Sequence, residues 1–506
     1  MNRIQAINMI CLCVTLFTAQ PLKAEPSSYT KYGLAPLKEE EVHYLENNIS
    51  KVIKVAPNKL GASRIKKELP DYEMPNLESS RNPVHTMQTK ASHALKFIPK
   101  SAPLPSSVDN SKLPSFPPIG DQQQLGSCVG WGSTYYQATH EIGLARGTNN
   151  KISNANILSP KWTYNLLNKG SDSGLSPVDA YKLLSMNGAP YMIDFPYDTN
   201  FTAWELDTQD WITAIYNRLA PYTLIPGLGG DRPQNLTAIK QALTNGHVLT
   251  LATFIESWQF TRIKSGPHKG EYAASWMNGT NGGHFMTIVG YDDNVWIDIN
   301  GNGTVDAGEK GAFLIANSWG TSWGNKGFIW IAYDAFLTKS KVKGAPSSNR
   351  VAAGTYLNSS VISALPKAAN YTPELIGTFS IAQTLRNQLN IGAGISSVAD
   401  STPTSKITIP AFSNAGGSLG FDGTKSRTSQ SATFAIDLTD LALQSNTNDP
   451  SRYYLLISDS IRGNPTTLNS FSLLDMIHER TVNTTLPLPT SYDNGKGTLY
   501  IDYALQ

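Results

Sequence analysis

The three cysteines of this 506-residue chain are placed so unevenly that they exclude a fold held together by internal disulfides. Cys11 and Cys13 lie within residues 1–24, and Cys128 is the single cysteine after them. Residues 1–24 combine an early arginine with an apolar run and end in Ala24, which is typical of a cleaved secretory signal peptide. We therefore expect a secreted mature chain with one free thiol, and an odd thiol in an oxidising compartment indicates a reactive cysteine or a buried, inert one.

The overall composition predicts a globular protein of more than one domain. Hydrophobic residues make up 40% and charged residues 16% of the 506 positions, which is too hydrophobic for a disordered chain. The 41 basic and 39 acidic residues give a net charge of +2, so the charge gives no reason to expect a nucleic-acid partner. The apolar run near the start is too short to cross a bilayer, and no later stretch is apolar enough for a membrane span.

After the signal peptide at 1–24, composition divides the chain into three parts. Residues 25–105 combine a charged helical pattern with proline-rich stretches, which suits a removable segment or a plain linker. Residues 106–345 carry the aromatic and glycine-rich motifs. Residues 346–506 contain short runs of Ile, Tyr, Phe and Thr between Gly, Ser, Asn and Asp clusters, and this pattern predicts an all-β, sandwich-like domain.

Three separated motifs in residues 106–345 contain the groups that cysteine catalysis needs. Cys128 ends QQQLGSC and precedes a stretch with helical character, and a helix N-terminus favours a thiolate. His284 stands in GGHFMTIVGYDD, where two glycines come before it and an apolar run follows. Asn317 stands in ANSWGTSWG, and its side-chain oxygen could accept from one imidazole nitrogen while the other faces the thiol.

These motifs, in this order, resemble the papain-like cysteine peptidases over about 240 residues. The resemblance implies an α+β, two-lobed peptidase with a helical lobe and a β-barrel-like lobe. It further implies that Cys128 is the nucleophile, His284 the base and Asn317 the residue that orients the base. Gln122, six residues before Cys128, matches the glutamine that helps the Cys128 backbone N–H to hold the oxyanion.

The resemblance also suggests how the substrate cleft is built and where this chain departs from its relatives. From the residues themselves, Trp319 and Trp323 are expected to shield the bond between His284 and Asn317 from water. Leu125 replaces a disulfide-forming cysteine, and Val129 replaces the tryptophan that usually follows the nucleophile. The residues expected to line the cleft are Gly126, Gly174, Gly283 and Trp319.

An insertion between His284 and Asn317 has the spacing of an EF-hand-type calcium loop. Residues 298–309 read DINGNGTVDAGE, in which oxygen ligands alternate and Gly303 permits the sharp turn. The flanking residues look like strands, so a loop within a hairpin is expected, holding a structural calcium ion; the alternative is a solvated turn. The expected ligands are Asp298, Asn300, Asn302, the Thr304 carbonyl, Asp306 and Glu309.

The sequence therefore predicts a secreted cysteine endopeptidase that acts on protein or peptide substrates without a catalytic cofactor. The resemblance implies that residues 25–105 are a propeptide that blocks the cleft, so the enzyme would be made as a latent proenzyme. A surface or carbohydrate ligand for residues 346–506 rests on fold-level analogy alone. The alternatives are a thiol acyltransferase on the same triad, or a binding protein whose site has decayed at Val129.

Overall fold

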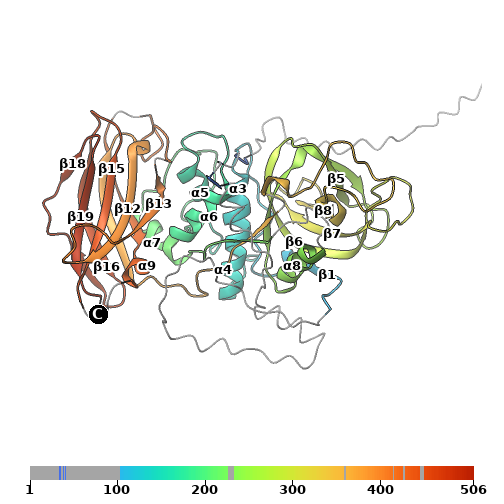
Figure 1. Cartoon of the computed structure of the whole chain (residues 1–506), viewed down its shortest axis with the longest axis horizontal. Coiled ribbons are helices and arrows are strands. Elements are labelled where there is room, and N and C mark those ends of the chain that lie inside the picture. The colour runs from blue at the N-terminus through green and yellow to red at the C-terminus, as the bar shows by residue number, and fades with distance from the viewer. Residues whose placement is uncertain are drawn as a thin grey trace, which may run out of the picture.

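The computed structural model describes residues 33–35, 38, 40–41, 103–225, 233–357, 360–413, 415–425, 428–444 and 449–505. The predicted signal peptide and most of the predicted propeptide lie outside the described residues. In the described part, three layers lie side by side: the C-terminal strands, a group of helices, and the strands of residues 107–363 (Figure 1).

The helical layer is built around one long helix that begins at Cys128. It starts as a short α-helix, continues as a π-helix and ends as an α-helix that Gly147 terminates at φ +74°. Two neighbouring helices begin with a serine cap followed by proline: Ser159 accepts from the Trp162 N–H, and Ser176 from the Val178 N–H. The helices are α3 (Cys128–Gly130), η2 (Trp131–Ala138), α4 (Thr139–Arg146), α5 (Pro160–Leu167), α6 (Pro177–Met186), α7 (Thr208–Tyr216) and α8 (Pro233–Thr244).

Against one side of this helix lies a ten-stranded sheet with the order β2-β10-β3-β6-β7-β8-β5-β4, to which β1 and β9 are attached at β6 and β5. The neighbouring strands β6 and β7 are antiparallel, as is β3 with β6. The strands are β1 (Ser107–Asp109), β2 (Thr223–Ile225), β3 (Leu249–Phe254), β4 (Trp258–Arg262), β5 (Tyr272–Asn278), β6 (Gly283–Trp296), β7 (Lys310–Ala316), β8 (Phe328–Ala332), β9 (Arg350–Val351) and β10 (Val361–Ser363). Since β9 and β10 lie beyond residue 345, strand pairing keeps this part of the chain with the first sheet.

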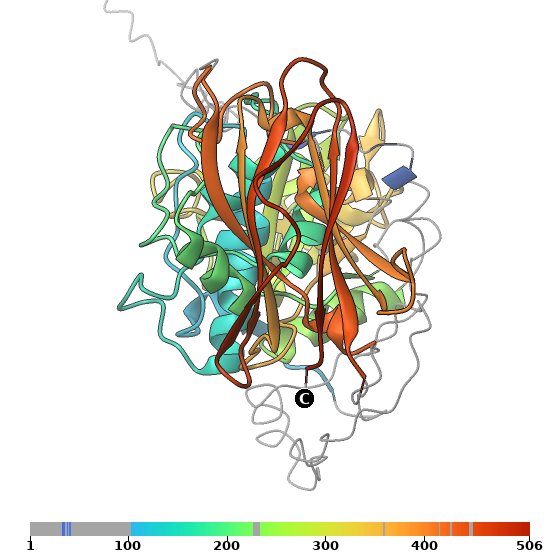
Figure 2. The same cartoon turned by 90° about the vertical axis from the view of Figure 1, so that its left-hand side faces the viewer.

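From Leu375 onward the chain forms two antiparallel sheets, which Figure 2 shows from the outside. One has the order β14-β11-β16-β17 with β18 attached to β16, and the other has the order β13-β12-β15-β19. A short helix, α9 (Thr439–Ala442), follows β14 in the sequence. The strands are β11 (Leu375–Gln383), β12 (Leu389–Ser397), β13 (Ser405–Ser413), β14 (Gln430–Asp437), β15 (Ser451–Asp459), β16 (Thr466–Asp475), β17 (Arg480–Asn483), β18 (Thr490–Tyr492) and β19 (Lys496–Tyr503).

The alternation along β15 differs from what its sequence indicates. Its two adjacent tyrosines suggest either exposed ligand-stacking rings or one ring inward and one outward. Instead both are buried: Tyr453 is 0% exposed and Tyr454 is 2% exposed. The outward ring is covered because the Tyr454 hydroxyl donates to the Asp400 carbonyl and bonds the Ser396 hydroxyl. Neither tyrosine is therefore a surface stacking platform.

The C-terminal sheets and the helices share one hydrophobic core. Trp211 of α7 lies with its ring centroid 5.5 Å from that of Phe412 and 4.9 Å from that of Phe434. On the helical side it also meets Trp162 of α5 at 4.5 Å. These rings place an aromatic cluster between segments more than 200 residues apart in sequence.

A buried ion pair joins the same two layers. Arg218 contacts Asp437 at 2.5 Å, and the two side chains are only 4% and 0% exposed. Arg218 also donates to the Ser185 carbonyl at the end of α6 and reaches Asp440 at 3.0 Å. A charge pair buried this deeply is costly to break, because either partner alone would be an uncompensated charge.

Among the described helices, none is both long enough and apolar enough to cross a membrane.

Replacing Trp211 by alanine would remove the ring on which both layers pack. We expect Trp211→Ala to lower the free energy of unfolding by about 3–5 kcal/mol, as for other large core truncations. Ile152→Ala is the control, because Ile152 is 83% exposed. Urea unfolding of the full chain measures both, and equal effects of the two substitutions would contradict a shared core.

Candidate active site

The thiol of Cys128 sits at the first residue of the central helix and is fully buried. Ser127, the residue before the helix, makes no side-chain cap, so the first turn is held by backbone geometry and packing. The following turn packs closely on β6, since a Cβ at Gly132 would lie 2.6 Å from the Phe285 ring. Cys128 is a free cysteine and is 0% exposed.

The imidazole of His284 and the side chain of Asn317 lie in hydrogen-bond contact. His284 stands at the start of β6 and Asn317 directly after β7, and the Nε2 and Oδ1 atoms are 2.7 Å apart. The Ser318 N–H also donates to this Oδ1 at 2.8 Å, so the oxygen is the acceptor and Nε2 carries the proton. The contact expected from the sequence is therefore present.

Two aromatic residues enclose this pair. The Trp319 ring lies 4.5 Å from the imidazole centroid, tilted by 32°, which excludes water from that side. The Tyr136 hydroxyl donates to the Asn317 carbonyl at 2.7 Å and thereby fixes the backbone. Nδ1 of His284, the nitrogen left for the thiol, has no hydrogen-bond partner among the described residues.

Gln122 is fully buried, and hydrogen bonds hold it from several directions. Its amide nitrogen donates to the Leu125 carbonyl at 2.8 Å, and its amide oxygen accepts from the Ser318 hydroxyl at 2.7 Å. Its carbonyl accepts from the Tyr197 hydroxyl at 2.8 Å. The side-chain amide is thus oriented before any substrate arrives, as an oxyanion donor needs to be.

Three of the four residues predicted to line the cleft lie against an extended piece of the N-terminal region. Leu34 pairs in parallel with Leu175: the Leu175 N–H donates to the Gly33 carbonyl at 2.9 Å, and the Ala35 N–H donates to the Leu175 carbonyl at 3.0 Å. A Cβ added to Gly174 would lie 2.5 Å from the Gly33 carbonyl oxygen. A Cβ added to Gly283 would lie 3.4 Å from Leu34. Gly126 is even closer, because its carbonyl oxygen would be 1.9 Å from a Cβ on Gly33. Trp319, the fourth, lies on the imidazole instead.

Buried polar contacts anchor this extended piece. Glu41 is 1% exposed, and its carboxylate accepts from the Ser176 hydroxyl and from the Lys38 N–H, both at 2.7 Å. The Lys38 ammonium reaches Asp179 of α6 at 3.1 Å. On the other wall, the Tyr356 hydroxyl donates to the Ala35 carbonyl. The piece is therefore tied to both sides of the cleft.

Burial controls the protonation of both reactive groups in this form of the chain. Desolvation raises the pKa of the Cys128 thiol to about 12, although backbone hydrogen bonds at Phe285 and Gly33 lower it. Desolvation lowers the pKa of His284 to about 4, which the bond to Asn317 offsets in part. With the cleft covered, the thiol is therefore protonated and the imidazole neutral at pH 7.

Sequence reasoning missed two residues that shape the cleft. Asp172 accepts from the Gly126 N–H at 2.7 Å and from the Tyr164 hydroxyl, so it ties the segment before the nucleophile to the helical layer. The position of Asp172 in a glycine- and serine-rich loop could have indicated such a role from the sequence. No sequence pattern marks Tyr356, because it lies after the peptidase motifs and reaches the cleft only through folding.

The insertion at residues 298–309 forms a loop between β6 and β7, as its flanks predict. Asp306 accepts from the amide groups of Asn300 at 2.7 Å and Asn302 at 2.6 Å. Gly303 has φ +77° and open space where a side chain would begin, and its N–H donates to Asp298 at 3.0 Å. The predicted oxygen-bearing side chains therefore lie together on one tight loop.

Two carboxylates of the loop differ in how fully their oxygens are bonded. Asp298 is 8% exposed, and its Oδ1 is buried with no hydrogen-bond partner among the described residues. Glu309 is 0% exposed and accepts from Trp296 Nε1 and from the N–H groups of Ile299 and Asp306 at 2.7–3.0 Å. No group of three His, Cys, Asp or Glu side chains suited to a metal occurs in the described part of the chain. An oxygen site would thus need amide and carbonyl oxygens in addition to the carboxylates.

A buried thiol with a backbone hydrogen bond at Phe285, the residue after His284, together with an oriented imidazole and a fixed amide, is typical of a cysteine-type hydrolase. The family model described as "Papain family cysteine protease" matches residues 104–348. These residues are a papain-like cysteine peptidase, and the protein is a cysteine-type peptidase.

Proteins that are similar to this chain include two proteinases of Entamoeba histolytica and two solved structures. Cysteine proteinase 2 of Entamoeba histolytica is 25% identical over 272 residues, which are 54% of this chain and 77% of the relative. Cysteine proteinase 1 of the same organism is 26% identical over 226 residues, covering 44% and 62%. Among solved structures, xylellain of Xylella fastidiosa is 19% identical and covers 60% of this chain and 90% of its own, with a TM-score of 0.35. The proform of Amb a 11 from ragweed pollen is 15% identical and covers 53% and 67%, with the same TM-score of 0.35.

The raised pKa of Cys128 has a measurable consequence. A thiol with a pKa of about 12 carries about a thousandfold less thiolate at pH 7 than an ordinary cysteine, so iodoacetamide should modify it about a thousandfold more slowly. The sign is fixed by the raised pKa: the rate should keep rising from pH 7 to above pH 10. Mass spectrometry of the peptide that carries Cys128 measures the rate in the folded chain, and a plateau near pH 9 would contradict the burial of the thiol.

Proposed function

We propose that the protein is a secreted cysteine endopeptidase, made as a latent proenzyme, in which Cys128, His284 and Asn317 form the catalytic triad. The observation that carries the proposal is the joint burial of the thiol, the oriented imidazole and the Gln122 amide at a cleft that already holds an extended peptide. Secretion is supported by the pattern of residues 1–24 alone.

The chemistry begins once residues 33–35 leave the cleft. Water then reaches the site, so the pKa of Cys128 falls and that of His284 rises, and the proton passes from Sγ to Nδ1. The thiolate attacks the substrate carbonyl carbon and forms a tetrahedral intermediate, whose oxyanion accepts from the Gln122 amide and the Cys128 N–H. His284 protonates the leaving amine, and the resulting thioester is hydrolysed by water.

Asn317 acts on the base and not on the substrate. Its oxygen, fixed by the Ser318 N–H, accepts from Nε2 and keeps the proton there in the neutral ring. Nδ1 is therefore the nitrogen that exchanges a proton with the thiol. Trp319 stabilises this arrangement by covering the ring.

Residues 25–105 act as the intramolecular inhibitor in this proposal. Two contacts support it: Leu34 fills the cleft between Gly283 and Leu175, and Glu41 is buried against Ser176. Burying a carboxylate costs free energy unless hydrogen bonds compensate it, and here Ser176 and Lys38 donate to Glu41. Such a specific contact is expected of a docked inhibitory segment and not of a plain linker. Comparing Cys128 alkylation before and after removal of residues 25–105 tests latency, which requires a faster reaction after removal.

We further propose the two-lobed division of the peptidase, a helical lobe and a β-barrel-like lobe within residues 106–345, followed by a sandwich-like domain. The lobes correspond to the helices α3–α7 and to the ten-stranded sheet. The pairing of β9 and β10 with that sheet argues that the sandwich-like domain begins nearer to Leu375 than to residue 346.

A structural calcium ion in the loop 298–309 is also proposed. The unpaired, buried Oδ1 of Asp298 and the oxygen-rich donor set fit a hard cation. Asn300, Asn302, Asp306 and the Thr304 carbonyl would complete the ligands, and Glu309 would join by giving up backbone hydrogen bonds. The ion would stiffen the connection between the strands that carry His284 and Asn317.

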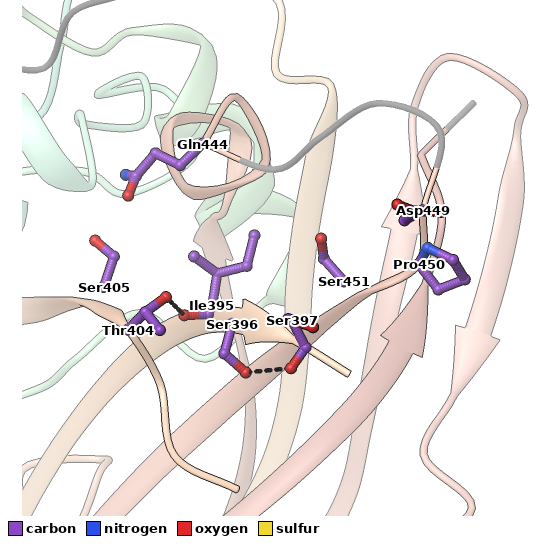
Figure 3. A pocket seen from close by; sticks show the side chains of 9 residues that line it. All are labelled: Ile395, Ser396, Ser397, Thr404, Ser405, Gln444, Asp449, Pro450 and Ser451. Carbon is purple, nitrogen blue, oxygen red and sulfur yellow. Dashed lines mark hydrogen bonds between the residues drawn. The ribbon is translucent and has the colours of Figure 1, made fainter. Parts of the chain in front are cut away.

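The C-terminal domain contains a hollow in which a polar or carbohydrate ligand would be sought. The cavity has a volume of about 370 Å³. Figure 3 shows that its lining includes serine side chains of β12, β13 and β15, beside Ile395, Gln444, Asp449 and Pro450. Two of the hydroxyls at this cavity already donate to neighbouring carbonyls, at Ser397 and at Ile395. Retention of the full chain on a glycan array would support a saccharide, and a lack of retention would remove this ligand class.

The central prediction is peptide hydrolysis that depends on Cys128. The chain from which residues 25–105 have been removed should cleave members of a peptide library, and Cys128→Ala should abolish cleavage. Gln122→Ala should lower kcat by about 10²–10³, as for other oxyanion donors. Gln124→Ala is the matched control, because Gln124 is exposed two residues away.

The same assay separates the alternatives. Adding an amine acceptor and finding amide product in place of acid would identify an acyltransferase. Cleavage that persists in Cys128→Ala, or an absence of cleavage from every form, would exclude the proposed peptidase site.

Calcium binding should raise thermal stability. With a dissociation constant of about 0.1–1 mM, about 10 mM calcium would stabilise the folded chain by about 1.4–2.7 kcal/mol. Asp298→Asn should remove most of this gain while leaving the melting temperature in chelator nearly unchanged. Equal melting temperatures in calcium and in chelator for the unaltered chain would exclude the site.

A further inference from the structure

A loop between two strands of the C-terminal sheets contacts the loop that precedes Leu175, the residue that pairs with the extended N-terminal piece. We refer to residues 168–175 as the cleft loop and to residues 415–421 as the β13–β14 loop. At their contact the two backbones meet directly: a Cβ on Gly417 would lie 2.6 Å from the Lys169 carbonyl oxygen and 2.7 Å from the Gly170 Cα. From the other side, a Cβ on Gly170 would lie 3.0 Å from the Gly417 Cα. Any side chain at Gly417 must therefore displace backbone.

The cleft loop also contacts the segment before Cys128 and the extended piece at residues 33–35. Its Asp172 carboxylate accepts from the Gly126 N–H at 2.7 Å, two residues before the nucleophile. Its last residue, Leu175, makes both backbone hydrogen bonds to the extended chain in the cleft, at 2.9 and 3.0 Å. The position of the cleft loop thus sets where an extended peptide pairs.

The β13–β14 loop is itself held rigidly. Arg386 is 1% exposed, and its guanidinium donates to the carbonyls of Gly416 at 2.5 Å, Phe421 at 3.2 Å and Thr202 at 2.5 Å. The same guanidinium lies 4.7 Å from the Trp204 ring centroid. Since the fork of one arginine joins this loop to the segment before α7, the loop cannot shift without breaking buried hydrogen bonds.

We propose that the β13–β14 loop positions the cleft loop for substrate binding, with Gly417 and Arg386 as positioning residues. The C-terminal domain is then part of the machinery that binds substrate, in addition to any ligand of its own. This inference rests on the proposed function, because it takes the cleft that now holds residues 33–35 to be the substrate cleft.

The test compares two glycine substitutions in the full chain after its activity has been released by processing. Gly417→Ala should raise KM by about tenfold and leave kcat within about twofold, because it disturbs binding and not the chemical step. Gly463→Ala is the matched control. Gly463 has φ +79° and Gly417 has φ +77°, so alanine is equally strained at both positions, but a Cβ on Gly463 would have nothing within 4 Å. An unchanged KM in Gly417→Ala, with Cys128-dependent activity intact, overturns this inference alone.

A second measurement does not require activity. Hydrogen exchange at the Leu175 and Gly126 amides should become about tenfold faster in Gly417→Ala and in Arg386→Lys, which keeps the charge and loses the fork, but not in Gly463→Ala. If Gly417→Ala fails to fold, Arg386→Lys decides, and unchanged exchange there overturns the inference. An unaltered chain without Cys128-dependent hydrolysis would instead remove the substrate cleft, and with it both proposals.

Discussion

The helix that begins at Cys128 is the element on which the rest of the structure depends, because it is buried along most of its length. Every residue from Cys128 to Gly143 is buried, so the helix has the ten-stranded sheet on one side and the other helices on the other. Its π-helical segment widens the turns, and at its end the Thr139 N–H reaches back five residues to the Thr134 carbonyl. A wide turn gives room for large side chains on all sides, which suits a helix without a solvent face. Cys128 is therefore positioned by the whole core and not by a local motif.

The helical layer is stabilised from outside as well as from within. Aromatic rings and the buried pair of Arg218 and Asp437 join it to the C-terminal sheets, so those sheets are not a loosely tethered appendage. The chain thus replaces covalent cross-links by extending its hydrophobic core across two parts of the sequence.

Sequence patterns predicted the parts of the site that depend on short motifs. Gln122 and Cys128 share one motif, and the bond between His284 and Asn317 follows from two strand ends that a hairpin brings together. The position of the loop 298–309 between two strands was also predictable, since the alternation on either side is local.

What the sequence did not reveal depends on contacts between distant segments. Tyr356 bonds the Ala35 carbonyl and Glu41 accepts from the Ser176 hydroxyl, and both come from parts of the chain without any recognisable motif. For β15 the expected core strand with one tyrosine inward is present, but alternation alone did not reveal that the segment around Asp400 covers the outer ring of Tyr454. In physical terms, local periodicity reports one buried surface and cannot report a second one that is supplied by a loop.

Because Cys128 is the single cysteine after residue 24, the fold of residues 25–506 does not depend on an internal disulfide. A reductant that restores the Cys128 thiol breaks no cross-link within residues 25–506, because that part of the sequence contains no second cysteine. Oxidation of Cys128 likewise forms no cross-link within residues 25–506, so its direct effect is confined to the thiol itself.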